Sequence, residues 1–182
     1  MARGALFASV LANWVLAGWW WGELPERIPI HFDGFGNADG WAQRSWWAWF
    51  AMPVLATGIA LGFGLVLPRV MVALAKSNSP WLNVPNKKAF TALPEDARVR
   101  AVRGPATWLS GLAIAVQVLF VWITFGSARV ATGAWSRLPP GPSYALIAAV
   151  LACAACLAVA AHRAVRREIA AQARATRSNA AV

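Results

Sequence analysis

The sequence predicts an all-α membrane protein with four transmembrane helices, and three observations support this fold class. The chain of 182 residues is 59% hydrophobic and only 13% charged, which would leave large apolar patches on a water-soluble domain. Four long stretches lack any charged side chain. The Lys and Arg residues collect between these stretches, mainly on one predicted side of a membrane.

The four charge-free stretches are each long enough to cross about 30 Å of hydrocarbon as a helix. They comprise residues 5–21, 46–67, 107–125 and 144–161. A helix is expected in each, because other backbone conformations would leave polar groups unpaired in lipid. Residues 15–18 resemble a signal-peptide cleavage site. A single preceding arginine and an apolar run that continues to Trp21 disfavour cleavage.

The positions of the basic residues predict the orientation. Thirteen of the 17 Lys and Arg residues lie before the first stretch, in the loop 68–105 or in the tail 162–182, and four lie on the other side. The positive-inside rule therefore predicts that both termini are cytoplasmic (N-in/C-in). The net charge of +10 reflects this topology, so no nucleic-acid partner is expected. Anionic lipid headgroups are the expected neighbours of the inner loop.

Side chains inside the stretches favour helix packing over transport. No Asp, Glu, Lys, Arg or His lies within them, which argues against a pump or a proton-coupled transporter. Asn13 and Gln117 are expected to hydrogen-bond between helices, and Gly58 and Gly62 to admit a close helix from this chain or another. The tryptophans at 19–21 and at 46, 47 and 49 are expected to anchor the outer interface.

The outer loop, residues 22–45, is expected to be short and structured. Pro25 and Pro29 favour an extended start, and the Gly, Asn and Asp residues of its second half favour tight turns. His31, Asp33 and Asp39 are candidates for a metal or acid–base site. The loop offers one histidine and no cysteine, and Phe35 occupies a ligand position of the calcium-loop pattern, so hydrogen-bonded turn residues are the preferred interpretation.

Four prolines of the basic inner loop, residues 68–105, are expected to divide it into short pieces: Pro80, Pro85, Pro94 and Pro105. Pro94 followed by Glu95 and Asp96 predicts the start of a short helix that reaches about Arg103 and leads towards the third stretch.

Both loops resemble a bacterial membrane family of unknown biochemical function, found at the N-terminus of SdpI-type bacteriocin immunity proteins and in shorter stand-alone proteins. The outer-loop pattern of this family is met by Leu24, Pro25, Ile28, Pro29, His31, Phe32, Gly36, Asp39, Gly40 and Trp41. Its inner-loop pattern is met by Asn83, Val84, Pro85, Asn86 and Lys87 and fits less closely beyond them. The resemblance implies a domain over residues 1–105, followed by two further spans and a basic tail over residues 106–182.

The resemblance implies a stand-alone protein of the bacterial inner membrane but assigns no role to the motif residues. We expect a non-enzymatic multi-pass protein active in peptide-toxin immunity, sensing or signalling, with no catalytic, metal or cofactor-binding residues. One alternative is an accessory subunit of a larger membrane complex. The other is a membrane enzyme or metal site built on the outer loop. The lipid bilayer is the main expected partner. A protein partner or a second copy of the chain is a further possibility that the sequence leaves open.

Overall fold

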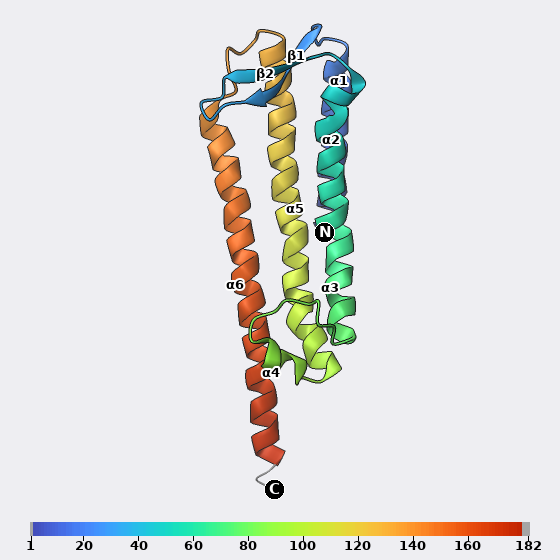
Figure 1. The fold of residues 1–182 in the computed structure, drawn as a ribbon, viewed down its shortest axis with the longest axis vertical. Coiled ribbons are helices and arrows are strands. Elements are labelled where there is room, and N and C mark those ends of the chain that lie inside the picture. Colours follow the sequence, from blue (N-terminus) through green and yellow to red (C-terminus); the bar gives the residue numbers. More distant parts are fainter. Residues whose placement is uncertain (1, 180–182) are drawn as a thin grey trace.

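The computed structural model describes residues 2–179 as a bundle of long helices with a two-stranded β-hairpin across one end (Figure 1). We call this the hairpin end. The opposite end, which carries the loop between α3 and α5 and the last part of α6, is called the basic end. In chain order the elements are α1 (Ala2–Trp21), β1 (Arg27–Phe32), β2 (Ala38–Gln43), α2 (Trp46–Leu61), the π-helix η1 (Gly62–Val66), α3 (Leu67–Lys76), α4 (Lys87–Thr91), α5 (Glu95–Ala131) and α6 (Pro140–Asn179).

Helices α2, η1 and α3 form one continuous rod from Trp46 to Lys76. Ser45 begins it as an N-cap, with its side chain accepting a hydrogen bond of 3.2 Å from the backbone N–H of Ala48. The π-turn lies just before Pro68, which has no N–H to donate to the carbonyl of Gly64 four residues earlier. The hydroxyl of Ser110 on α5 donates to that carbonyl instead, at 3.2 Å.

Helix α5 is the centre of the bundle and packs against α1, α2, α3 and α6. It contains more buried residues than any other helix within residues 2–179, whereas α6 contributes only Val165 to the buried core there. At about 1.5 Å per residue, α5 and α6 extend for about 55–60 Å, beyond the hydrocarbon thickness of about 30 Å. Each helix therefore reaches past its charge-free stretch into the polar regions.

Three rods within residues 2–179 are long and apolar enough to cross a membrane: Trp46–Lys76, Glu95–Ala131 and Pro140–Asn179. Helix α1 lies beside α2 and α5 at the hairpin end and is not one of the three, although it carries no charge after Arg3 (Figure 1). A fourth span and the N-in/C-in orientation therefore stay predictions.

Two polar side chains join the helices in the apolar middle of the bundle, as the sequence predicted. Thr124 on α5 donates a hydrogen bond of 3.0 Å to the Oδ1 atom of Asn13 on α1. The side-chain amide of Gln117 donates to the carbonyl of Ala56 on α2. Asn13 and Gln117 are at most 1% exposed, so these bonds hold α1, α2 and α5 in a fixed register.

The all-α expectation is wrong at the outer loop, which forms the hairpin. The helices are also longer than the charge-free stretches that predicted them. Charged side chains mark the end of a membrane span, but the helix continues past them. Pro105 does not break the inner loop from the third span, since α5 runs through it. Ala101 and Val102 beside it are buried in a cluster with α3 and α6, which offsets the lost backbone hydrogen bond.

One expectation about helix contacts is also corrected, and a second is narrowed to a partner outside this chain. Trp49 is no interfacial anchor: it is 4% exposed, and its indole N–H donates to the carbonyl of Ala17 at 2.8 Å. Within residues 2–179, a Cβ atom added at Gly58 or Gly62 would meet no atom of another helix within 4 Å, whereas Gly64 packs against Leu6 of α1. The close partner expected for the pair is therefore not a described helix of this chain, and a second chain stays a prediction.

Arg98, near the start of α5, fixes the fold of the basic end. It is 9% exposed and donates three hydrogen bonds to backbone carbonyls, from Nε to Ala75 at 2.8 Å, from Nη1 to Leu93 at 2.6 Å and from Nη2 to Lys76 at 3.0 Å. The carbonyls of Ala75 and Lys76 belong to the last turn of α3, where carbonyls lack the usual partner four residues ahead, although Ala75 also accepts from the N–H of Asn78 at 3.4 Å. The planar guanidinium thus joins the end of α3 to the start of α5.

Replacing Arg98 by Met is expected to destabilise the protein by about 3 kcal/mol, because hydrogen bonds to a charged group contribute about 1.5–3 kcal/mol each and unpaired carbonyls would remain. Thermal unfolding in detergent and protease cleavage within residues 77–94 measure the effect. The matched control is Arg163→Met on the exposed surface of α6. Equal melting temperatures for the two variants would contradict the role of Arg98.

Candidate functional site

The outer-loop motif forms a hairpin anchored on the helix ends. In the antiparallel register Ile28 pairs with Ala42, and Pro29 with Trp41, followed by an irregularity between Pro29 and His31. Such an irregularity tolerates a proline, which cannot donate to the ladder. Leu24 and Ile28 are buried in a cluster with residues of α1, α2 and α5. These apolar anchors fix the hairpin across the bundle end.

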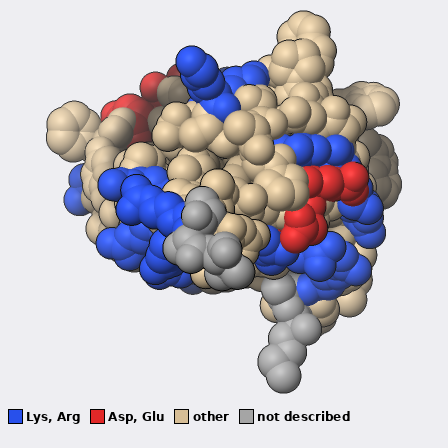
Figure 2. Space-filling model, turned by 90° about the horizontal axis from the view of Figure 1, so that it is seen from below, with Lys and Arg blue, Asp and Glu red and all other residues tan. Residues whose placement is uncertain are grey.

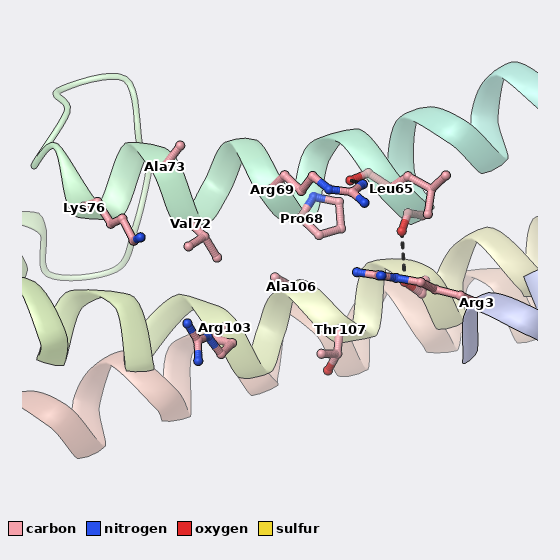
Figure 3. Close-up of a pocket in the computed structure, with 12 residues that line it drawn as sticks. Arg3, Leu65, Pro68, Arg69, Val72, Ala73, Lys76, Arg103, Ala106 and Thr107 are labelled. Atoms are coloured by element: carbon pink, nitrogen blue, oxygen red, sulfur yellow. Dashed lines mark hydrogen bonds between the residues drawn. The ribbon is translucent and has the colours of Figure 1, made fainter. Parts of the chain in front are cut away.

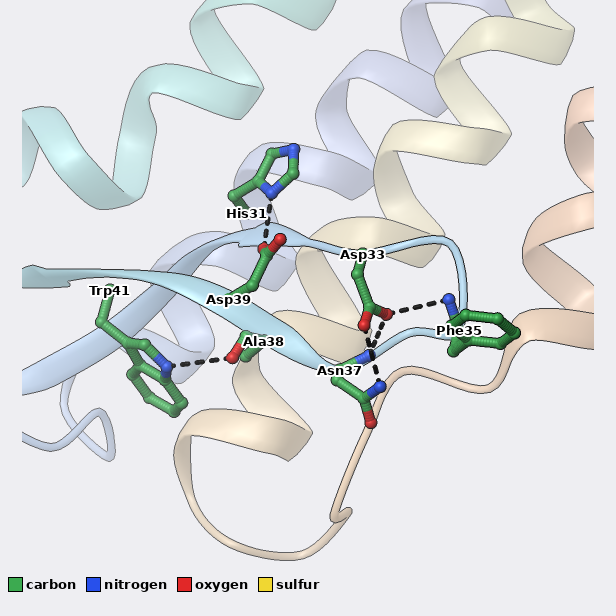
Figure 4. A network of polar contacts seen from close by, with 7 residues as sticks. All are labelled: His31, Asp33, Phe35, Asn37, Ala38, Asp39 and Trp41. Carbon is green, nitrogen blue, oxygen red and sulfur yellow. Dashed lines mark hydrogen bonds and ion pairs between the residues drawn. The ribbon is translucent and has the colours of Figure 1, made fainter.

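His31 and Asp39 form the one ion pair that the structure places in the hairpin within residues 2–179. The Nδ1 atom of His31 lies 2.5 Å from Oδ1 of Asp39, and the side chains are 71% and 48% exposed (Figure 4). A Cβ atom at Gly40 would lie 2.8 Å from that of His31, so a larger residue would displace the pair. Because the pair is exposed, it contributes little to stability and remains accessible to a ligand.

The hairpin turn is organised by Asp33. Its carboxylate accepts hydrogen bonds from the backbone N–H groups of Phe35 and Asn37, both at 2.8 Å, and from the Asn37 side-chain amide at 2.9 Å (Figure 4). The side-chain bond from Asn37 is the largest cause that holds the pKa of Asp33 below 3.8, and the backbone N–H groups add to it. Asp33 is thus occupied as a turn residue and does not join the His31–Asp39 pair.

The turn docks on the second half of the chain. The carbonyl of Gly36 accepts a hydrogen bond of 2.8 Å from the backbone N–H of Leu138, between α5 and α6. Gly36 has a φ of +85°, and a Cβ atom there would lie 1.9 Å from the Leu138 carbonyl oxygen, so only glycine fits. The hydroxyl of Tyr144 on α6 donates to the carbonyl of Gly34 at 2.6 Å.

Sequence analysis did not identify Leu138 or Tyr144 as part of this site. Tyr144 is the single tyrosine of the chain and stands at the start of the fourth charge-free stretch, just after a proline-rich segment. That position is the one sequence signal that marks it as a candidate partner for the outer loop.

A groove of about 530 Å³ lies beneath the hairpin, between α2, α5 and α6. Its size is within the range of small-molecule sites. Pro29, Ile30 and Phe32 form its roof, and apolar side chains such as Met52, Ile123 and Ile147 line its walls. Thr124, Ser127, Ser143 and Tyr144 supply the polar lining, and His31 and Asp33 are also among the lining residues. Such a groove suits an apolar or amphipathic ligand.

The inner-loop motif lies at the other end of the molecule (Figure 1). Asn86 adopts φ +52° just before α4, a left-handed conformation that Asn tolerates, and the Lys87 side chain donates to the carbonyl of Pro80. Asn83 is exposed and Pro85 is partly buried. This motif shapes the loop that covers Leu82 and Phe90, which are buried in the core of the basic end. The two motifs are therefore separate features.

No group of three or more His, Cys, Asp or Glu side chains that could hold a metal comes together within residues 2–179. His31 and Asp39 are adjacent, but the carboxylate of Asp33 is engaged by its own turn. The metal or acid–base site considered from the sequence needed His31, Asp33 and Asp39 together. In the structure Asp33 is not part of the His31–Asp39 pair.

The helices define the general class of the molecule, which is a helical membrane protein. Residues 8–57 match the family model described as a domain of unknown function (DUF1648). The match covers most of α1, the whole hairpin with its ten motif residues, and the first three turns of α2. The chain matches no curated protein and no solved structure. The matched region is thus the part that forms the roof and one wall of the groove.

Protonation of Asp33 is expected to loosen the turn. Because its folded-state pKa lies below 3.8, the stabilisation is complete above this ordinary value and is lost as the pH falls through the lowered folded value. A nitroxide label at Phe35→Cys, with Cys153 and Cys156 replaced by Ala, should become more mobile only below about pH 3.8. In a matched Asp33→Asn variant this step should vanish. A step that persists there would assign the titration to another group.

Proposed function

We propose that this protein is a non-enzymatic, multi-pass protein of the bacterial inner membrane that binds an apolar or amphipathic segment of a membrane-active peptide in the groove beneath the hairpin. The hairpin end faces outward and both termini are cytoplasmic. Binding serves sensing of the peptide or immunity to it, as the resemblance to the N-terminal domain of SdpI-type proteins implies. The groove supports this proposal most directly, because the family motif forms its roof.

The lining of the groove favours a peptide segment or acyl chain over a small polar substrate. Its apolar walls gain free energy by burying apolar surface, at about 25 cal/mol per Å². The few polar groups, among them the hydroxyls of Thr124 and Ser127, orient a ligand without offering a nucleophile–base pair. Within residues 2–179, helices α2 and α6 both pack on α5 and make few close contacts with each other, so a ligand can enter between them from the membrane.

The His31–Asp39 pair supports recognition at the mouth of the groove. Its exposed carboxylate and imidazole offer hydrogen bonds to a peptide backbone or to a basic side chain. The hydroxyl of the exposed Tyr144, which donates to the carbonyl of Gly34, couples the position of the turn to α6. Ligand entry that displaces this contact would shift the hairpin relative to the second half of the chain and so provide a signal.

Narrowing the groove is expected to weaken peptide binding. The variant Ile147→Trp places a larger side chain on the lining, and the matched control Leu151→Trp lies one turn further along α6, 65% exposed and outside the groove. The probe is a fluorescent amphipathic helical peptide of Leu and Lys, bound to the protein in nanodiscs. We expect at least tenfold weaker binding for Ile147→Trp, which corresponds to about 1.4 kcal/mol.

The same pair of variants is tested for survival of cells exposed to the unlabelled peptide, with His31→Ala/Asp39→Ala and the hairpin control Gln43→Ala beside them. Loss of protection should follow Ile147→Trp and the His31/Asp39 variant but neither control. Two results together would reject the groove as a peptide site, at matched amounts of protein in the membrane. They are equal cell survival for all four variants and equal peptide binding by Ile147→Trp and Leu151→Trp.

A further inference from the structure

A second cavity, of about 670 Å³, lies at the basic end and is separate from the groove beneath the hairpin (Figure 3). We call it the basic cleft. It lies between the start of α1, the rod formed by η1 and α3, and α5. Four of its lining residues are basic and none is acidic: Arg3, Arg69, Lys76 and Arg103. Three different helices thus contribute positive charge to one concave surface.

The charge of the basic cleft is not neutralised by nearby acids within residues 2–179. There, no carboxylate lies within 4.0 Å of any of the four basic groups. Asp96 and Glu168 both pair instead with Arg100, at 2.5 and 3.0 Å, and neither lines the cleft. Four like charges around one cavity repel one another, and a bound anion would relieve this repulsion.

The side chains are arranged so that an anion can be held by hydrogen bonds. The Nη1 atom of Arg69 donates to the carbonyl of Leu65 at 2.7 Å, which fixes its guanidinium beside the π-turn. In Figure 3 Lys76 extends from α3 towards α5, and the Arg103 side chain lies along α5. Guanidinium groups bind phosphate oxygens in a bidentate manner, and Lys supplies a mobile point charge.

The level of the cleft in the molecule indicates where the anion comes from. Arg3, Arg69 and Arg103 are the first charged residues met on α1, α3 and α5 when the charge-free stretches are followed towards the basic end. In a bilayer this is the level of the headgroups. Val72, Ala73 and Ala106 add apolar wall to the same cavity, so the surface suits a charged headgroup with its attached glycerol and the start of an acyl chain.

Figure 2 shows the basic end from below, where Lys and Arg form several patches among uncharged residues and acidic residues form fewer. This broad charge attracts any anionic bilayer without requiring a site. The cleft differs from that surface because its exposed cations come from three helices and line one open cavity beside the π-turn, a backbone feature frequent at functional sites. A specific headgroup site should therefore be separable from general attraction by mutation.

We propose that the basic cleft binds a phosphate group carried as the headgroup of an anionic phospholipid, held by Arg69, Lys76 and Arg103 with Arg3 closing one side. A free phosphate ion shares this chemistry and is the other source that the experiment distinguishes. The site is independent of the proposed peptide groove, since the two cavities share no lining residue.

The test uses the full chain, delipidated in detergent, and counts phosphatidylglycerol molecules bound by native mass spectrometry during a titration. The variant Arg69→Gln/Arg103→Gln is compared with Arg174→Gln/Arg177→Gln, which removes the same charge from the same end outside the cleft. We expect the first bound lipid to be at least tenfold weaker in the cleft variant and unchanged in the control. An equal loss in both variants would show that net charge alone attracts the lipid and would overturn the proposal.

Two further arms complete the test. In these arms phosphatidylcholine or inorganic phosphate replaces phosphatidylglycerol. If inorganic phosphate binds in a manner that depends on Arg69 and Arg103, and the lipid does not bind, the site belongs to free phosphate. That result would overturn the lipid assignment. Lys76→Gln, at an exposed position, serves as a milder second variant if the double variant melts at a lower temperature. We expect about threefold weaker phosphatidylglycerol binding in it, and wild-type binding would count against the cleft.

Discussion

The central constraint on this molecule is that the middle of every long helix must be free of charge, because ionised groups are costly in hydrocarbon. No charged residue lies between Arg3 and Glu23, between Arg44 and Arg69, between Arg103 and Arg129 or between Arg137 and Arg163. The middle of the bundle is therefore held by apolar packing and by the buried amides of Asn13 and Gln117. All ionic chemistry is placed at the ends, where the groove and the basic cleft lie.

The hairpin end shows why the outer-loop motif and the second half of the chain belong to one site. Gly36 fits its turn against Leu138, and Gly34 accepts from Tyr144, so the matched region rests on a connection that lies outside the match. Motif positions such as Leu24 and Gly36 then have structural roles, whereas His31 and Asp39 remain exposed. At the basic end Arg98 plays the corresponding organising role, and the inner-loop motif shapes the cover over the core.

Patterns governed by local chemistry could be predicted from the sequence, and long-range contacts could not. Absence of charge located the apolar rods, and Pro94 marked the start of α5. The strands were missed because Pro29 and the Gly-containing segment 38–43 carry weak strand propensity, and the cross-strand register with anchoring at Ile28 overrides it. Some hydrogen bonds join residues that are far apart in the sequence. The separation is 32 residues for Trp49, 110 for Tyr144 and up to 23 for Arg98, and no local sequence pattern encodes such contacts.

The proposed assignment of the two ends to opposite faces of the membrane is tested most directly by cysteine accessibility. With Cys153 and Cys156 replaced by Ala, single cysteines at Phe35 in the hairpin and at Arg177 in the last turn of α6 are labelled in intact cells by a maleimide that does not cross the membrane. The account predicts labelling at position 35 in intact cells and at position 177 only after the membrane is opened. Labelling of both positions in intact cells, or of position 177 alone, would contradict it.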